Sequence, residues 1–170
     1  INFFRKIVKL QNKYKQSKQE IANTIQTNAT LMNDEWAKFF KENKFGVGVS
    51  LDGDRHSNDM FRHNKKGKGC FDAVMRGVKI LRKHGIDPGF IQTVTKTNIH
   101  RTKQNFLFMT EVLKAEKFGI NHFFDHYQNN ELMGDENINN KDLTRILKTY
   151  IDLWIKKDST DLKIREIENF

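Results

Sequence analysis

Short apolar runs alternate along the chain with longer segments in which apolar residues recur every three or four positions. The short runs predict strands, and the second spacing predicts amphipathic helices. The predicted helices cover residues 1–10, 33–43, 71–84, 102–118 and 141–155, and the predicted strands cover residues 21–26, 45–51, 90–95 and 120–126. A further segment, residues 162–167, alternates polar and apolar side chains and is a candidate edge strand.

The order of these elements predicts an α/β fold. Strand and helix alternate four times, so we expect at least four parallel strands in the order in which the chain reaches them, with helices packed on one face. Gly85 and Gly119 follow two of the predicted helices, where glycine is typical of a left-handed cap. Asn33, followed by two acidic residues, is expected to cap the helix 33–43.

The strand at residues 45–51 lies in the sequence FGVGVSLDG, an apolar run that ends abruptly in polar residues. Its consecutive apolar positions predict a parallel strand that is buried on both faces. In α/β sheets ligands bind at the carboxyl ends of the strands. Ser50 and Asp52 therefore become candidate site residues.

The other predicted strands also end in polar residues. Thr27 and Asn28 follow the first, Gln92 lies on the third, and Asp125 and His126 end the fourth. Such groups suit a polar ligand laid across neighbouring strand ends, and we expect Ser50, Asp52, Thr27 and Asn28 to surround one cavity at one end of the sheet. The alternative is structural, because hydroxyls at strand ends often satisfy backbone groups and an Asp-Gly pair is often a turn.

Length, composition and charge narrow the class of protein. The 170 residues suit one domain, and 37% hydrophobic with 30% charged residues permits a core. The sequence has neither an apolar stretch of membrane length nor a secretory leader, so we expect a cytoplasmic protein without membrane contact. The net charge is +9, but the basic residues are spread over helical segments, and only the loop Arg62–Lys68 is compactly basic. Spread charge of this kind is typical of solvated helix faces and does not favour nucleic-acid binding.

The candidate metal ligands are few. Cys70 is the single cysteine, which excludes an internal disulfide and a cysteine-rich metal site in this chain. His122 and His126 are four residues apart, but no further ligands lie nearby in the sequence. We therefore predict no metal site within these residues.

Several motifs together resemble one family. IQTNATL is followed by GVGVSLDG, then by Asp59 and Arg62, and then by GKGCFDAVMRGVKILRKHGI. Over residues 20–126 this combination resembles radical S-adenosylmethionine (SAM) enzymes of the SPASM-associated, peptide-modifying group, which are related to sulfatase-maturating enzymes. The resemblance implies a partial (β/α)6 barrel of the TIM-like type, with S-adenosylmethionine across the strand ends.

The resemblance also implies roles for the candidate residues. Ser50 would contact the ribose or methionyl part of the cofactor, with Asp52 shaping the turn, and Thr27 and Asn28 would line the cavity. Arg62 matches the family's arginine and would hold a carboxylate. Gln92, at a polar strand end, completes the predicted cofactor site, while the catalytic residues and the roles of Asp125, His126 and Tyr127 stay open.

The chain departs from the family pattern at several places. Asp54, Asn58 and Ala29 stand where proline, histidine and glycine are usual. The CxxxCxxC motif that binds the [4Fe-4S] cluster, the glycine-glycine-glutamate motif and the carboxyl-terminal cysteine-rich domain are absent. A cluster needs several thiolates, so we expect part of a longer enzyme that is inactive by itself.

In this interpretation residues 1–128 are the third to sixth barrel strands with their helices, and residues 129–170 are a trailing helix and short strand. The substrate would be a peptide or protein, and the exposed strand 21–26 would favour self-association. Two other classes stay open. A cluster-free relative could bind an extended peptide along a strand edge, and a basic α/β domain could bind nucleic acid.

Overall fold

The computed structural model describes residues 1–123, 127–128, 131–132 and 135–168. Its main sheet contains the strands β1 (Thr24–Thr27), β2 (Gly46–Ser50), β3 (Gly89–Val94), β4 (Lys117–His122) and β7 (Lys163–Ile164), in that spatial order. All neighbouring pairs are parallel. The predicted parallel sheet in chain order is confirmed. In the predicted edge segment 162–167 only Lys163–Ile164 form a strand, and a short helix begins at Arg165. The strands β5 (Tyr127–Gln128) and β6 (Glu131–Leu132) form a separate antiparallel pair.

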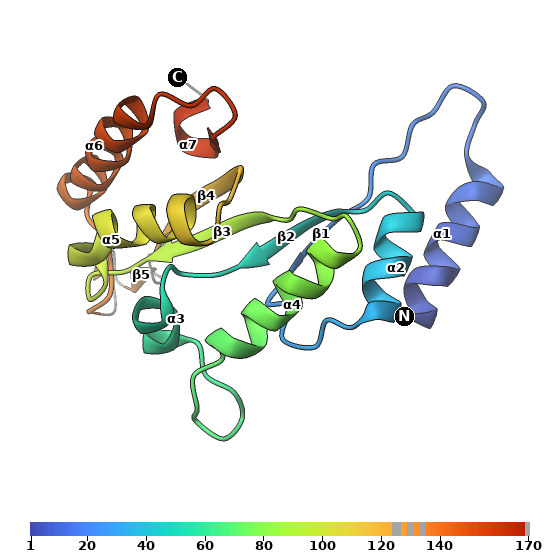
Figure 1. Cartoon of the computed structure of the whole chain (residues 1–170), viewed down its shortest axis with the longest axis horizontal. Helices are drawn as coiled ribbons and strands as arrows, with labels where there is room; N and C mark the ends of the chain where they lie inside the picture. Colours follow the sequence, from blue (N-terminus) through green and yellow to red (C-terminus); the bar gives the residue numbers. More distant parts are fainter. Residues whose placement is uncertain (124–126, 129–130, 133–134, 169–170) are drawn as a thin grey trace.

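Most helices lie where the apolar spacing predicts them. They are α1 (Asn2–Tyr14), α2 (Asp34–Glu42), α4 (Phe71–Lys83) and α6 (Asn140–Lys157). Figure 1 shows α1 beside α2 at one end of the sheet, and α6 with α7 (Arg165–Glu168) at the other. The short helix α3 (Arg55–Phe61) was not predicted, because it has too few turns for an apolar period to emerge.

The predicted helix 102–118 is wrong in its second half. A 3₁₀ turn, Ile99–Arg101, leads into α5 (Thr102–Leu107), which widens into a π-helical turn at Phe108–Val112. Lys114 then takes a left-handed conformation, with φ of 51°, and β4 begins at Lys117. Gly119 therefore lies inside a strand and caps nothing, whereas Gly85, with φ of 70°, does follow α4 as predicted. The apolar spacing continued through Phe118 because that side chain is a core residue of the strand.

The two faces of the sheet differ in how deeply their residues are buried. On β2, Val47, Val49 and Leu51 are buried, whereas Gly46, Gly48 and Ser50 point to the opposite side. The prediction of a strand buried on both faces is therefore wrong for this chain. Glycine contributes no side chain, and this concealed a period of two in GVGVSL. Hereafter the open face means the side of the sheet that carries Gly46, Gly48 and Ser50.

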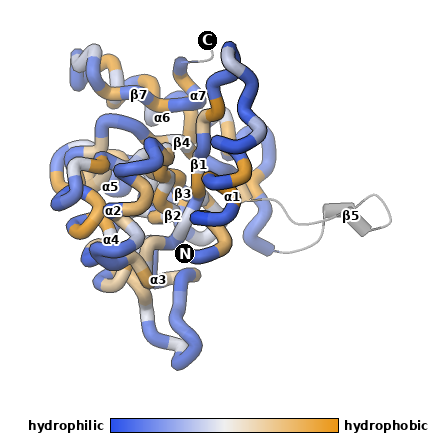
Figure 2. The backbone as a smooth tube through the Cα atoms, turned by 90° about the vertical axis from the view of Figure 1, so that its right-hand side faces the viewer, coloured by the Kyte–Doolittle hydropathy of each residue, from blue (hydrophilic) through white to orange (hydrophobic). Residues whose placement is uncertain are grey.

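The hydrophobic core fills the other side of the sheet. Side chains of α2, α4, α5 and α6 pack there against the buried strand residues, and they include Phe39, Phe40, Val74, Val78, Leu81, Phe106, Ile146 and Tyr150. Figure 2 shows the apolar strands at the centre of the molecule, and a hydrophilic loop between α3 and α4 that projects from it. Helices thus cover one face of the sheet, as predicted.

The carboxyl-terminal segment packs on this core. The ring of Tyr150 on α6 contacts the rings of Phe106 and Phe118, with centroids 5.5 and 6.0 Å apart. The strand β7 extends the sheet beyond β4, where Glu166 accepts a hydrogen bond from the Ile120 N–H at 2.8 Å. A domain boundary near residue 128 stays a prediction.

The free edge of β1 differs from the expectation. The strand begins at Thr24 rather than Ile21, and its exposed positions, Thr24 and Gln26, are polar. Self-association through it stays a prediction. Over the part of the chain that the structure describes, no helix combines the length and the apolar composition that crossing a membrane requires.

Candidate functional site

Ser50 ends β2 on the open face and is half-buried there. Its hydroxyl oxygen accepts a hydrogen bond of 3.0 Å from the side-chain amide of Gln26 on the neighbouring strand. The register pairs Gln26 with Gly48, so the side chain of Gln26 lies on the open face, as that of Ser50 does. Ser50 is thus held at the carboxyl end of the sheet, where the sequence predicted a site.

Asp52 lies just beyond the end of β2 and is almost fully buried. Its carboxylate accepts hydrogen bonds from Arg62 Nε at 2.5 Å and Arg62 Nη2 at 2.8 Å, and from the backbone N–H of Thr93 at 2.8 Å. One side chain therefore ties together the ends of β2 and β3 and the residue that follows α3. Charge-assisted bidentate pairs of this kind fix geometry as well as supplying energy.

Arg62 keeps part of its hydrogen-bonding capacity for a ligand. A guanidinium has five N–H donors, and Asp52 occupies only the edge formed by Nε and Nη2. Within the described residues Nη1 makes no hydrogen bond, and 27% of the side chain is exposed. Burial by itself would lower the pKa of Arg62, but the hydrogen bonds and charge of Asp52 outweigh it and raise that pKa. The group is a permanent cation with a free edge that fits a second carboxylate.

The turn after Asp52 is held by a polar cluster. Gly53 has φ of 122°, and a Cβ there would lie 2.2 Å from the side-chain oxygen of Asn105. Asp54 caps α3 by accepting from the Ser57 N–H at 2.9 Å, and it pairs with Arg101 at 2.5 Å. Burial works against ionisation of Asp54, yet its hydrogen bonds with Ser57 and Arg101 leave its pKa below the usual value.

Asn58 and Asp59 continue this support towards α4. Asn58 is fully buried, and its side chain lies 3.5 Å from the Asp52 N–H. Asp59 accepts a hydrogen bond of 2.8 Å from the Phe71 N–H at the start of α4. Asp54 and Asn58, two of the departures from the family pattern, thus have structural partners in this chain.

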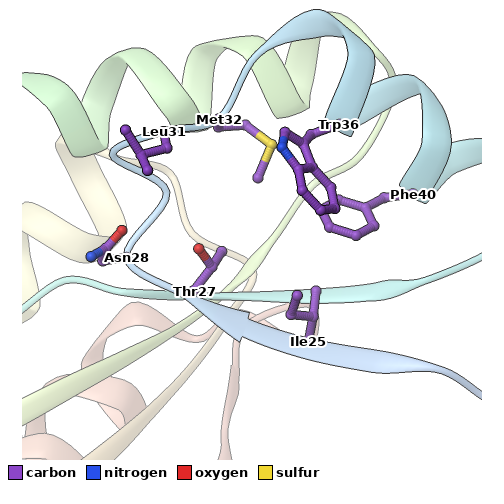
Figure 3. A pocket seen from close by; sticks show the side chains of 7 residues that line it. All are labelled: Ile25, Thr27, Asn28, Leu31, Met32, Trp36 and Phe40. Carbon is purple, nitrogen blue, oxygen red and sulfur yellow. The ribbon is translucent and has the colours of Figure 1, made fainter. Parts of the chain in front are cut away.

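Thr27 and Asn28 end β1, so they lie at the same end of the sheet as Ser50 and Asp52, as predicted. They line a different cavity, however, of about 210 Å³ between β1 and α2, together with Ile25, Leu31, Met32, Trp36 and Phe40 (Figure 3). Thr27 shares the helix-covered side of the sheet with Val49. Thr27 accepts a hydrogen bond from the Ala29 N–H and Asn28 accepts one from the Thr30 N–H, so both side chains satisfy backbone groups of the turn after β1. The expectation of one cavity for all four residues is not met by these two.

Gln92 requires a correction. It pairs with Ile120 and is fully buried on the helix-covered side, where its side-chain oxygen accepts from the Tyr150 hydroxyl at 2.7 Å. Its neighbours Ile91 and Thr93 face the open side instead. Because side chains alternate along a strand, a polar residue near a strand end reaches the ligand side at only every second position. Gln92 therefore lies away from Ser50 and Arg62.

Gln26 is the residue that sequence reasoning missed. The available signal was the glycine at position 48 in a strand interior, which often marks close approach of another group.

Asp125 and His126 lie outside the described residues, and so does the side chain of Tyr127.

The residues of this chain do not fit an iron–sulfur cluster. Cys70 is the single cysteine of the chain and is half-buried before α4. Among the residues placed by the structure, no three histidine, cysteine or acidic side chains gather as metal ligands would. A [4Fe-4S] cluster needs several thiolates, and this chain supplies one.

Comparison with known proteins gives relatives along nearly the whole chain. A serine-type anaerobic sulfatase-maturating enzyme from Bacteroides thetaiotaomicron is 32% identical over 93% of this chain and 41% of its own length. A cysteine-type anaerobic sulfatase-maturating enzyme from Clostridium novyi is 31% identical over 92% of this chain and 41% of its own length. The chain thus spans less than half the length of these relatives.

Solved structures also match this chain over nearly its whole length. The structure of native anSMEcpe with bound AdoMet matches with a TM-score of 0.90 and 26% identity, over 98% of this chain and 46% of that one. A second structure of it, with AdoMet and the Cp18Cys peptide, also has a TM-score of 0.90 at 26% identity, over 99% of this chain and 47% of that one. The sheet described here is therefore the partial barrel that the motifs implied.

The family model described as the radical SAM superfamily matches residues 2–106, a range that includes β1, β2 and β3 and the Ser50, Asp52 and Arg62 group. Because this match covers more than half of the chain, the chain belongs to the radical SAM superfamily.

Proposed function

We propose that this chain is the S-adenosylmethionine-binding part of a radical SAM enzyme that modifies a side chain of a peptide or protein. Two findings support the reaction class. The relatives are named as sulfatase-maturating enzymes of serine and cysteine type, and the similar structures carry AdoMet, one of them with a peptide. Bound S-adenosylmethionine supplies the radical chemistry of this superfamily, and the protein supplies binding and orientation.

The observation that carries the proposal is the free edge of Arg62. S-adenosylmethionine has one carboxylate, and a guanidinium edge binds a carboxylate through two parallel hydrogen bonds. Asp52 fixes the opposite edge of Arg62, and Ser50 offers a hydroxyl at the end of the same strand as Asp52. Ser50 and Arg62 would therefore hold the methionyl part of the cofactor, while Asp52 orients Arg62 and makes no contact itself.

Equilibrium binding of S-adenosylmethionine to the protein that contains this chain tests the assignment. Arg62→Lys keeps the positive charge but loses the planar edge, so we expect at least tenfold weaker binding, which corresponds to about 1.4 kcal/mol. Arg55→Lys is the matched control, because Arg55 begins the helix that Arg62 follows and also forms a bidentate pair, with Asp72, but is exposed. Unchanged affinity in Arg62→Lys would exclude this role for Arg62.

The same titration separates the alternatives. A cluster-free peptide-binding relative would bind peptide without any affinity for S-adenosylmethionine. A nucleic-acid binder would show binding to nucleic acid that falls steeply as salt increases. The cytoplasmic location stays a prediction.

A further inference from the structure

The side chain of Gln26 occupies the space that a side chain on Gly48 would need. An ideal Cβ on Gly48 would lie 2.0 Å from the side-chain oxygen of Gln26 and 3.0 Å from its Cδ. The two residues are paired on adjacent strands of the open face. Glycine at position 48 therefore allows the Gln26 carboxamide to lie flat across β2.

This placement brings the Gln26 amide group to Ser50. The nitrogen donates to the Ser50 hydroxyl oxygen at 3.0 Å, while the oxygen of the same carboxamide lies over Gly48. A serine hydroxyl can donate one hydrogen bond and accept two. Since Gln26 is the donor in this contact, the hydroxyl hydrogen of Ser50 is left to point towards an acceptor on a ligand.

Gln26 has no evident role in holding the fold together. Its side chain is exposed at the free edge of the sheet, and Ser50 is the partner of its only side-chain hydrogen bond among the described residues. The residues on the helix-covered side of β1 are Ile25 and Thr27, which alternate with it. A substitution of Gln26 should therefore leave stability almost unchanged.

We propose that Gln26 is a positioning residue that sets the Ser50 hydroxyl to donate to the bound cofactor, and that position 48 must be glycine because any side chain there displaces the Gln26 carboxamide. This inference rests on the proposed binding of S-adenosylmethionine at Ser50. It predicts that two chemically unrelated substitutions, one on each strand, produce the same defect.

Equilibrium binding of S-adenosylmethionine to the protein that contains this chain measures the effect. Gln26→Met keeps the length of the side chain and removes the amide, and Gly48→Ala forces the amide away. We expect each to weaken binding about fivefold, the size of one hydrogen bond, with unchanged thermal unfolding in the absence of cofactor. The double variant should be no weaker than either single variant, because both act through one contact.

Gly89→Ala is the matched control. Gly89 lies on β3, where it also lines the open face, but an added Cβ would meet its nearest atoms at 3.9 and 4.0 Å. Its affinity for S-adenosylmethionine should equal that of the unaltered protein. A loss as large as that of Gly48→Ala would mean that any side chain on this face blocks the ligand, and would overturn the role of Gln26.

The Ser50→Ala background distinguishes the possible failures. If Gln26 acts through Ser50, then Gln26→Met and Gly48→Ala have no further effect once Ser50 is replaced by alanine. If Ser50→Ala weakens binding but neither other variant does, the positioning role is wrong and the proposed function stands. If Ser50→Ala itself leaves the affinity unchanged, both the placement of the cofactor at Ser50 and the role of Gln26 are wrong.

Discussion

Ser50 and Gln92 lie near the ends of adjacent strands, yet their side chains have different surroundings. Ser50 pairs with Ile91 on the open face, and Gln92, one residue later, is buried on the helix-covered side. There its side-chain oxygen accepts from Tyr150, while its nitrogen has no partner among the described residues. Burial raises the pKa of Tyr150 well above the usual value, so Tyr150 stays a neutral donor.

The first prediction concerns this buried pair. Tyr150→Phe leaves the buried oxygen of Gln92 without a donor, and we expect a loss of about 1–3 kcal/mol in the free energy of unfolding. Adding Gln92→Leu removes the stranded polar group, so the double variant should recover part of that loss. Denaturant unfolding measures both effects.

Cofactor binding provides the control for that pair. Gln92→Leu should leave the affinity for S-adenosylmethionine unchanged, because the side chain faces away from the open face. Weaker cofactor binding in a variant of normal stability would show instead that Gln92 reaches the ligand, as the sequence suggested.

At the scale of elements, the short helix α3 connects the candidate site to the rest of the molecule. Asp54 caps its first turn, Arg62 follows its last turn, and Arg101 joins Asp54 from the segment before α5. Arg101 also donates to Ser57 at 2.9 Å, and Ser57 in turn donates to Asn105 at 2.8 Å. The position of Arg62 therefore depends on contacts between elements that are far apart in the sequence.

The second prediction concerns Asp54. Asp54→Ala removes the cap and the ion pair, and should cost about 1–2 kcal/mol at neutral pH. Asp54→Asn should cost less, because asparagine also caps helices well. Chemical unfolding of the two variants, compared with the unaltered chain, measures the difference.

The stability of the fold should depend on pH through Asp54. Burial by itself would raise the pKa of Asp54, but its hydrogen bonds with Ser57 and Arg101 keep that pKa below the usual value. The charge of Asp54 stabilises the fold fully above its unfolded pKa, at about 4. This contribution is lost as the pH falls through the lower folded pKa. The stability difference between the unaltered chain and Asp54→Asn should therefore shrink below about pH 4, and a difference that grows on acidification would contradict the assignment.

At the scale of the whole molecule, the sheet has one covered face and one open face. Helices from both halves of the chain cover the first, whereas glycines at positions 48, 89 and 119 line a cavity of about 260 Å³ on the second. Ser50 lies at the carboxyl end of the open face. Gln26 lines this cavity and bonds to Ser50, whereas Ser50 and Arg62 do not line it, so the cavity lies beside the candidate cofactor site and not within it.

The third prediction is that the 170-residue chain by itself does not cleave S-adenosylmethionine reductively, even after anaerobic reconstitution with iron and sulfide. The reason is the number of ligands, since one cysteine cannot supply the thiolates of a cluster. Chromatographic detection of 5′-deoxyadenosine provides the measurement, with circular dichroism to verify that the chain is folded. A fusion that supplies a CxxxCxxC segment is the positive control, and product from the chain alone would refute the prediction.

The sequence by itself determined the order and direction of the main strands. Apolar runs and helical spacing are local properties, and parallel pairing follows from the alternation of strand and helix. Ser50 and Asp52 could be placed at a strand end for the same reason. The motifs around them were sufficient to indicate the radical SAM superfamily, with which the family match agrees.

Only the tertiary structure decided which face each side chain occupies and which partners it meets. Asp52 and Arg62 are ten residues apart, Gln26 and Ser50 are 24 apart, and Gln92 and Tyr150 are 58 apart. No local pattern encodes such contacts, because they depend on strand register and on where a helix ends. The chain after α5 shows the same limit: its apolar spacing fits a helix, but burial of Phe118 against Phe106 and Tyr150 makes it a strand.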